Sequence, residues 1–99
     1  MTYRVRYTRG ARRDLLRLYE FLLERDMATA ERALGALRKS TEILGEFPFT
    51  CRKADDSNPF LRELIVSFGS SGYVVLFEID DATTVTILAV RHQREDDYH

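Results

Sequence analysis

Three apolar segments, each of strand length, follow one another through the second half of the chain with only short turns between them. They span residues 61–68, 73–79 and 83–90. The first turn, 69–72, is rich in glycine and suits a hairpin, and the second turn, 80–82, contains two aspartates. Parallel neighbours need a crossover of roughly a dozen residues or more, so turns this short predict an antiparallel meander.

The first half of the chain predicts one strand followed by two helices. Residues 3–7 alternate between apolar and charged side chains, as a half-buried strand does. From Ala11 to a turn at 25–26 apolar side chains recur at helical spacing, and a second helix is expected from about residue 28 to Gly45, with Thr29 as a candidate N-cap. The apolar face of the first helix consists of Leu15, Leu18, Tyr19 and Leu22. Two amphipathic helices joined this tightly predict an antiparallel helical hairpin.

The fold class follows from this order of elements. Proline at position 48 ends the second helix, and the polar residues 50–59 are expected to form a loop. The order is therefore β-α-α-β-β-β, and the expected class is α+β, with the helical hairpin packed on one face of an antiparallel sheet. We expect residues 1–99 to form a single domain. Whether the first strand lies at an edge of the sheet or inside it stays open.

The composition suits a soluble, cytoplasmic protein. Hydrophobic residues make up 44% of the chain and charged residues 31%, enough for a core and a solvated surface. Cys51 is the single cysteine, which excludes an intramolecular disulfide and a thiolate cluster for zinc. No apolar run approaches the roughly 20 residues of a membrane span, and residues 1–6 do not resemble a secretory signal. We therefore expect no membrane partner.

The net charge of −1 argues against a general nucleic-acid binder, but the charge is unevenly distributed. Residues 1–25 contain seven arginines against three acidic residues, a local balance of +4. Acidic residues collect later, at 55–56, 80–81 and 95–97. The basic region suits an acidic partner, and the alternative is a solvated, arginine-rich helix face.

Few groups in this sequence suit catalysis or metal binding. The two histidines are His92 and His99, and neither has partners at the spacing of a metal site. Residues 69–72 lead into a strand and contain no lysine, so they do not form a phosphate-binding loop. We expect neither a metal nor a cofactor.

Planar, hydrogen-bonding side chains are concentrated in segment 90–99, after the last strand. Arg91, His92 and Arg94 belong to it, and Arg62 lies on a neighbouring strand. Guanidinium and imidazole groups bind phosphate or carboxylate through forked donors, so these residues predict a small basic surface. The alternative is a charged, frayed tail at the end of the domain.

Three motifs resemble the RelE/ParE superfamily of bacterial toxins. They are NPFLREL at 58–64, GYVVLFEI at 72–79 and VTILAVRH at 85–92. In that superfamily an LREL-like strand, a GYR-type strand and a strand ending in VxH or VRHxR follow a two-helix hairpin. The resemblance covers essentially the whole chain and implies the same β-α-α-β-β-β fold, and the VRH ending is closer to the ParE branch.

The resemblance implies one of two activities. RelE-like members are ribosome-dependent mRNA endonucleases that use basic side chains on the sheet and a C-terminal tyrosine or histidine. ParE-like members inhibit DNA gyrase and have no known nuclease chemistry. Members of both branches are neutralised by an antitoxin whose extended or helical segment wraps the toxin.

The sequence departs from the nuclease pattern at three positions. Val74 stands where RelE-like enzymes place the arginine of the GYR strand, and Ile65 and Ser67 stand where they place lysines. Cleavage of a phosphodiester needs positive charge fixed at the developing pentacoordinate phosphorus, so these losses cost transition-state stabilisation. The candidate catalytic residues that remain for a nuclease lie away from the family's positions: Arg62, Arg91, Arg94 and Tyr98.

We therefore expect a ParE-like toxin of a type II toxin–antitoxin (plasmid stabilisation) system that inhibits DNA gyrase and is neutralised by a cognate antitoxin. Its expected target-binding residues are Arg62, Arg91, His92 and Arg94. One alternative is a RelE-like endonuclease that acts on ribosome-bound mRNA, and another is a non-toxic member that only binds its antitoxin. The expected resting state is a hetero-oligomer with the antitoxin, with a homodimer as the alternative.

Overall fold

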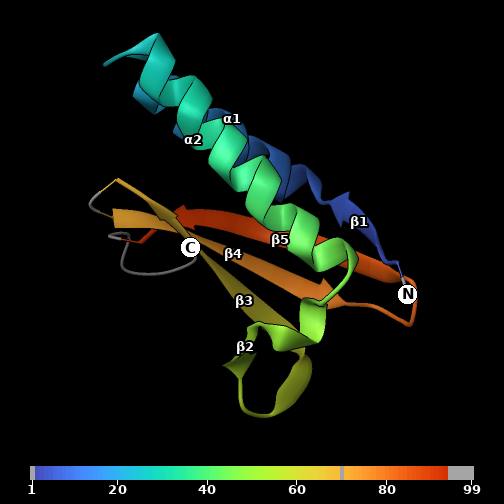
Figure 1. Cartoon of the computed structure of the whole chain (residues 1–99). Helices are drawn as coiled ribbons and strands as arrows, with labels where there is room; N and C mark the ends of the chain where they lie inside the picture. Colours follow the sequence, from blue (N-terminus) through green and yellow to red (C-terminus); the bar gives the residue numbers. More distant parts are fainter. Residues whose placement is uncertain (1, 70, 94–99) are drawn as a thin grey trace.

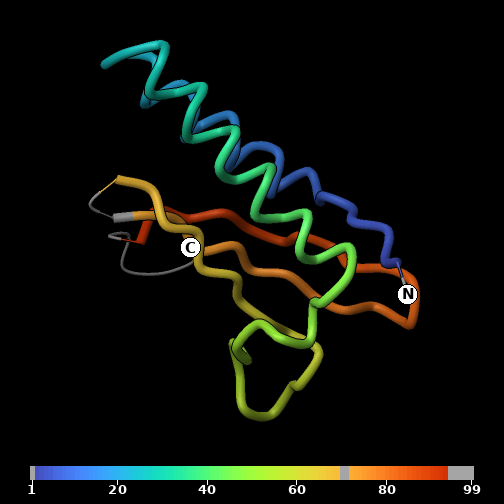
Figure 2. Tube along the Cα trace, viewed as in Figure 1, coloured from blue at the N-terminus to red at the C-terminus, as the bar shows by residue number. Residues whose placement is uncertain are grey.

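A two-helix hairpin lies on one face of a five-stranded sheet in the computed structural model, which describes residues 2–69 and 71–93 (Figure 1). The turn between the helices extends past the end of the sheet, as the chain trace in Figure 2 also shows. The helices are α1 (Arg9–Leu23) and α2 (Met27–Thr41), and the 3₁₀ turns η1 (Glu42–Gly45) and η2 (Pro48–Thr50) follow them. The strands are β1 (Arg4–Tyr7), β2 (Arg52–Asp55), β3 (Asn58–Phe68), β4 (Ser71–Ile79) and β5 (Thr84–His92). The expected α+β class and the helical hairpin are confirmed.

The sheet has the strand order β1-β5-β4-β3-β2. β3, β4 and β5 form the expected antiparallel meander, and β2 pairs antiparallel with β3. β1 lies at the opposite edge and runs parallel to β5, with Val5 beside Val85, so the sheet is mixed. Both helices lie between β1 and the meander in the sequence, and they provide the long connection that a parallel pair requires.

The polar segment 50–59 contains a strand where the sequence predicts only a loop. β2 pairs with β3, with Arg52 opposite Glu63, and β3 begins at Asn58 rather than at Leu61. The side chains of β2 are mostly exposed, and an exposed edge strand needs no apolar alternation. β2 is extended because it pairs with β3, and the local sequence of residues 52–55 does not predict this pairing.

The start of α2 differs from its predicted cap. Asp26 is the N-cap, and its Oδ2 accepts the Thr29 hydroxyl at 2.7 Å and the Thr29 N–H at 3.1 Å. The prediction that Thr29 caps the helix is therefore wrong, because the helix begins before it, at Met27, and Thr29 lies in the first turn. The hydrogen bond from the Thr29 hydroxyl is the main cause that holds the pKa of Asp26 below its ordinary value. The α-helix ends at Thr41, and η1 continues to the predicted end at Gly45.

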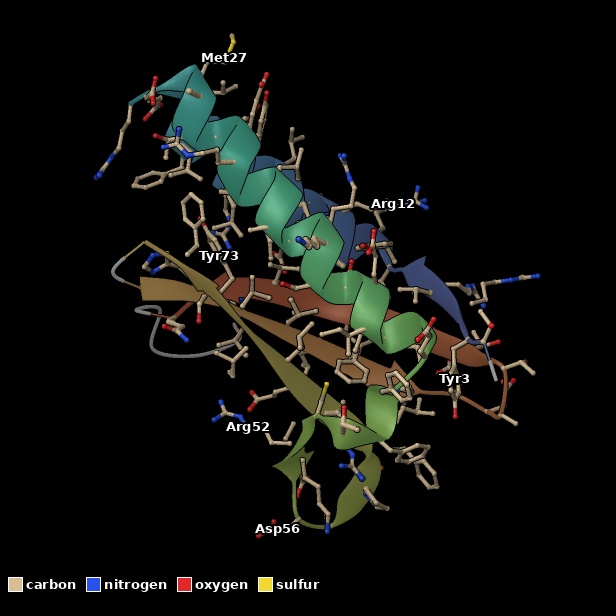
Figure 3. The ribbon with its side chains drawn as sticks, viewed as in Figure 1. Tyr3, Arg12, Met27, Arg52, Asp56 and Tyr73 are labelled. Atoms are coloured by element: carbon tan, nitrogen blue, oxygen red, sulfur yellow. The ribbon has the colours of Figure 1, made fainter. Side chains whose placement is uncertain are left out.

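The core lies between the helical hairpin and the sheet, and Tyr73 occupies this layer in Figure 3. Alternate positions of β4 are buried there, as expected for a strand with one face covered. The strands contribute Val66, Tyr73, Val75, Phe77, Ile79, Val85, Ile87 and Val90 to the core cluster, and the helices and η1 contribute Ala11, Leu18, Ala33, Leu37 and Leu44.

The β3–β4 hairpin requires glycine at two positions. Gly69 has a φ of 62°, in the left-handed region that other residues rarely adopt. A Cβ at Gly72 would collide with the backbone carbonyl of Val66 on β3. The predicted glycine-rich turn is confirmed, and glycine is required at Gly69 by the backbone conformation and at Gly72 by the close approach of β3.

Candidate functional site

The end of β5 is bound to α1 rather than to a further strand. β1 ends at Tyr7, so the backbone of β5 beyond that point needs other partners. The Thr8 hydroxyl donates a hydrogen bond to the Leu88 carbonyl at 3.3 Å. The Val90 N–H donates to Asp14 Oδ2 on α1 at 2.9 Å. The first helix and its N-cap thus cover the part of the β5 edge that β1 leaves unpaired.

Arg91 binds the same carboxylate. Its Nη1 lies 2.6 Å from Asp14 Oδ2, and the two side chains are only 12% and 16% exposed. An ion pair so far withdrawn from water is costly to break, because removing one partner leaves the other charge poorly solvated. The sequence places Arg91 in a basic surface but does not identify Asp14, since no local pattern connects the first helix with the last strand.

His92 lies at the border of the core. Its imidazole packs edge-on against the Tyr73 ring, with 5.6 Å between the ring centroids and 87° between the planes. Tyr73 is 3% exposed and also contacts Phe68, and burial raises the pKa of the Tyr73 hydroxyl. The Gln93 N–H donates to the Gly72 carbonyl at 2.8 Å, which continues the pairing with β4 beyond the strand end.

Arg62 lies elsewhere on the sheet and holds the segment before β2. Its Nε donates to the Pro59 carbonyl at 2.7 Å, and its Nη1 donates to the Cys51 carbonyl at 2.8 Å and to the Phe49 carbonyl at 3.3 Å. The guanidinium also lies over the Phe49 ring, 5.3 Å from its centroid. Burial raises the pKa of the Cys51 thiol, and the charge of Arg62 opposes this shift. Arg62 therefore makes several structural contacts in this chain.

The structure does not bring Arg62 together with Arg91. Across the sheet, Arg91 lies opposite Val74 of β4, which in turn lies opposite Ile65 of β3. Arg62 lies three residues further along β3 and two strands away from β5, which corresponds to roughly 14 Å from strand geometry. Arg91 and His92 are adjacent, and Arg94 and Tyr98 lie outside the described residues.

Ile65, Val74 and Arg91 lie side by side on β3, β4 and β5 and form a row across the sheet. Ile65 and Val74 occupy two of the three positions where the nuclease pattern has cations. Ile65 is 39% exposed and Val74 is half-buried, so both present apolar surface. Arg91 is the only cation in this row of described residues, and its guanidinium is bound to Asp14. Ser67, at the third position, is exposed and uncharged. Among residues 2–69 and 71–93, this face of the sheet therefore presents no cluster of cations of the kind that would stabilise a phosphorane.

No three His, Cys, Asp or Glu side chains among residues 2–69 and 71–93 come close enough together to hold a metal ion. Within the part of the chain that the structure describes, every helix is too short or too polar to cross a lipid bilayer.

The fold defined by this hairpin and sheet is that of the RelE/ParE-type toxins. The chain is similar to a chain of the chromosomal ParDE system of P. aeruginosa, with a TM-score of 0.74, 16% identity, and 92% of this chain and 96% of that chain covered. It is also similar to a chain of the toxin–antitoxin complex RelBE2 of Mycobacterium tuberculosis, with a TM-score of 0.59, 29% identity, and 94% and 100% covered.

The family follows from the sequence comparisons. The family described as the ParE toxin of the type II toxin–antitoxin system, parDE, matches residues 5–97, and the chain belongs to it. The chain is 37% identical over 86 residues to Toxin RelE3 of Caulobacter vibrioides, with 86% of this chain and 88% of that protein covered. It is 34% identical over 79 residues to Toxin RelE1 of the same organism, with 80% and 82% covered. The expected RelE/ParE relationship is confirmed.

Proposed function

We propose that this toxin inhibits DNA gyrase and is held inactive by a cognate antitoxin. The observation that carries the gyrase proposal is the row formed by Ile65, Val74 and Arg91. In-line cleavage of RNA needs positive charge held close to the reacting phosphorus, and each missing donor costs about 3–4 kcal/mol of transition-state stabilisation. In this row two positions are aliphatic, and the guanidinium of the third is bound to a carboxylate.

An edge of the sheet supports the antitoxin part of the proposal. β2 pairs with β3 only between Asn58 and Glu63, so within the described residues the outer backbone edge of 64–68 has no strand beside it. An extended peptide can add to such an edge through main-chain hydrogen bonds. The RelBE2 structure of Mycobacterium tuberculosis is described as a toxin–antitoxin complex, and the ParDE structure as a toxin–antitoxin system.

A second candidate function is a ribosome-dependent mRNA endonuclease. The curated relatives named Toxin RelE3 and Toxin RelE1 favour it. Its candidate catalytic residues would be Arg62, Arg91, Arg94 and Tyr98. Two of these, Arg62 and Arg91, already bind carbonyls or a carboxylate in this chain, and phosphate would have to compete with those partners.

Two assays on the same purified protein separate the candidates. In the first, the chain is titrated into DNA gyrase with relaxed plasmid, and supercoiling is followed on agarose gels. In the second, the chain is added to a translating extract, and cleavage of a reporter mRNA is mapped by primer extension. We expect inhibition of supercoiling and an intact message.

The proposed target-binding residues are tested with matched variants. His92→Ala should weaken the inhibition of gyrase, whereas Lys39→Ala, an exposed cation on α2, should leave it unchanged. Unaltered supercoiling by a protein whose expression arrests growth would refute the gyrase proposal, and cleavage of the message would establish the endonuclease instead.

A further inference from the structure

A hollow of about 610 Å³ lies at the end of the sheet opposite His92, beside the β4–β5 turn. Its walls combine the rings of Tyr3, Phe49 and Phe60 with the carboxylates of Glu78, Asp80 and Asp81. Figure 3 shows Tyr3 at this end of the molecule and Tyr73, the neighbour of His92, near the other end. The hollow is therefore separate from Arg91 and His92, whereas Arg62, another expected target-binding residue, lies over Phe49 in its wall.

The phenylalanine side chains in the wall of the hollow are about half exposed to solvent. Phe49 and Phe60 are 48% and 50% exposed, and their rings meet edge to face with 6.2 Å between centroids. Phe47, two residues before Phe49, does not line the hollow but is also 59% exposed. Single exposed apolar side chains are ordinary, but several gathered around a hollow are typical of a binding surface. Burying these rings against a partner would remove much apolar area from water.

The acidic wall is held in place by the β4–β5 turn. Asp81 Oδ1 accepts the Thr83 N–H at 2.8 Å and the Thr83 hydroxyl at 3.0 Å, and the hydrogen bond from the N–H is the largest cause that lowers the pKa of Asp81. Asp80 accepts the Thr86 hydroxyl. Within residues 2–69 and 71–93, no hydrogen bond or ion pair engages the Glu78 carboxylate. Two carboxylates held by the turn and a third without such a bond, all beside aromatic faces, favour a cation.

We propose that this hollow binds an arginine or lysine side chain on an apolar segment of a partner polypeptide. A guanidinium can stack on a phenylalanine face and bind a carboxylate at the same time. The chain already contains half of this arrangement, since Arg62 lies over Phe49. Three carboxylates would repel a phosphate, so the charge of the hollow excludes nucleic acid as its occupant.

A second copy of the chain is the competing occupant. The exposed face of α1 carries Leu16, which is 56% exposed, among four exposed arginines. These are Arg9, Arg12, Arg13 and Arg17. Such a contact would be head-to-tail and would form open chains of molecules rather than a closed dimer. The test must therefore distinguish a partner segment from self-association.

The test uses the full chain and a short fluorescein-labelled peptide of alternating arginine and leucine, with binding followed by fluorescence anisotropy. The matched peptide contains citrulline, which keeps the shape of arginine and lacks its charge. We expect the arginine peptide to bind at least about tenfold more tightly than the citrulline peptide. Backbone NMR shifts should change around Phe60 and Glu78.

Single substitutions in the wall of the hollow test whether the peptide binds there, and matched substitutions on α1 serve as controls. Phe60→Ala and Glu78→Gln should each weaken binding of the arginine peptide about fivefold or more. Phe21→Ala, which removes a phenylalanine that is 52% exposed on α1, and Glu20→Gln should leave it unchanged. A thermal melt of each variant establishes that it is folded before binding is measured.

Several results would overturn the proposal. These are equal binding of the citrulline peptide, equal loss in Phe60→Ala and Phe21→Ala, or NMR shifts confined to other surfaces. Sedimentation velocity at increasing concentration tests the second copy as occupant. Self-association that Phe60→Ala abolishes would assign the hollow to another copy of this chain and refute a partner segment. None of these outcomes depends on whether the toxin acts on gyrase or on mRNA.

Discussion

Arg91 and Asp14 form an ion pair with 2.6 Å between Nη1 and Oδ2, and this pair joins the last strand to the first helix. The same carboxylate oxygen accepts the Val90 N–H at 2.9 Å. One side chain of α1 therefore satisfies both the charge and the backbone at the point where β1 no longer covers β5. Arg91, which the sequence marks as a target-binding residue, has a structural contact whether or not it also binds a target.

Replacing Asp14 should destabilise the fold. Asp14→Ala leaves the Arg91 guanidinium and the Val90 N–H without their shared acceptor, and we expect the free energy of unfolding to fall by about 2–4 kcal/mol. Asp14→Asn keeps an acceptor oxygen and should cost less. Urea denaturation followed by circular dichroism gives the values. Glu20→Ala, at an exposed position of the same helix, is the control and should change stability by less than about 0.5 kcal/mol. Equal losses in Asp14→Ala and Glu20→Ala would show that the ion pair contributes nothing.

The sequence predicts the parts of the fold that depend on local pattern. The helical spacing of Leu15, Leu18 and Leu22 and the short turns of the meander determine the hairpin and three strands, and the structure contains them. The parallel pairing of β1 with β5 and the pairing of β2 with β3 join segments with no shared pattern. Such long-range pairing is decided by packing, which the sequence does not display.

The candidate site shows the same division. Residue type alone identifies Arg62, Arg91 and His92 as groups able to bind anions. Their present partners come from elsewhere in the fold: Arg62 binds carbonyls of η2 and its neighbours, and Arg91 binds Asp14 of α1. A charge pattern in the sequence cannot say whether a guanidinium faces a ligand or a carbonyl, because the chain must fold before that choice is made.

The Asp26 cap predicts a measurable pKa difference. The Thr29 hydroxyl and N–H bind the ionised carboxylate, so the folded pKa of Asp26 lies below its ordinary value of 3.8. A folded pKa below the unfolded one means that this cap stabilises the fold above about pH 3.8 and that its contribution is lost as the pH falls through the folded pKa. Carboxyl NMR titration should show the pKa of Asp26 rising in Thr29→Ala, which removes the hydroxyl. An unchanged pKa in that variant would contradict the assigned cause, and the pKa of Asp55, held by Ser57, serves as the internal control.

Two glycines should respond to alanine in opposite directions. A Cβ at Gly72 would collide with the Val66 carbonyl in the neighbouring strand, so Gly72→Ala should destabilise the fold by about 2 kcal/mol or more. Gly35 lies on α2 with nothing within 4 Å of an added Cβ, so Gly35→Ala should stabilise the fold by about 0.5–1 kcal/mol through helix propensity. Thermal denaturation of both variants checks the pair. A stable Gly72→Ala would mean that the hairpin can shift to admit a methyl group.

Arg62 should be needed for local order and not only for charge. Its guanidinium donates to the carbonyls of Pro59 and Cys51 and lies over the Phe49 ring, a geometry that the single ammonium of lysine cannot reproduce. We expect Arg62→Lys to lower the free energy of unfolding by about 1–2 kcal/mol, because lysine cannot make all of these hydrogen bonds. The loss stays modest because the hydrogen bonds of Arg62 are largely exposed to water. Amide hydrogen exchange around Cys51 should accelerate more than exchange in α2. Arg52→Lys is the matched control, since its 61% exposed side chain binds only Glu63 among the described residues. If Arg62→Lys keeps native stability and exchange but no longer inhibits the target, the guanidinium serves target binding and the structural role is refuted.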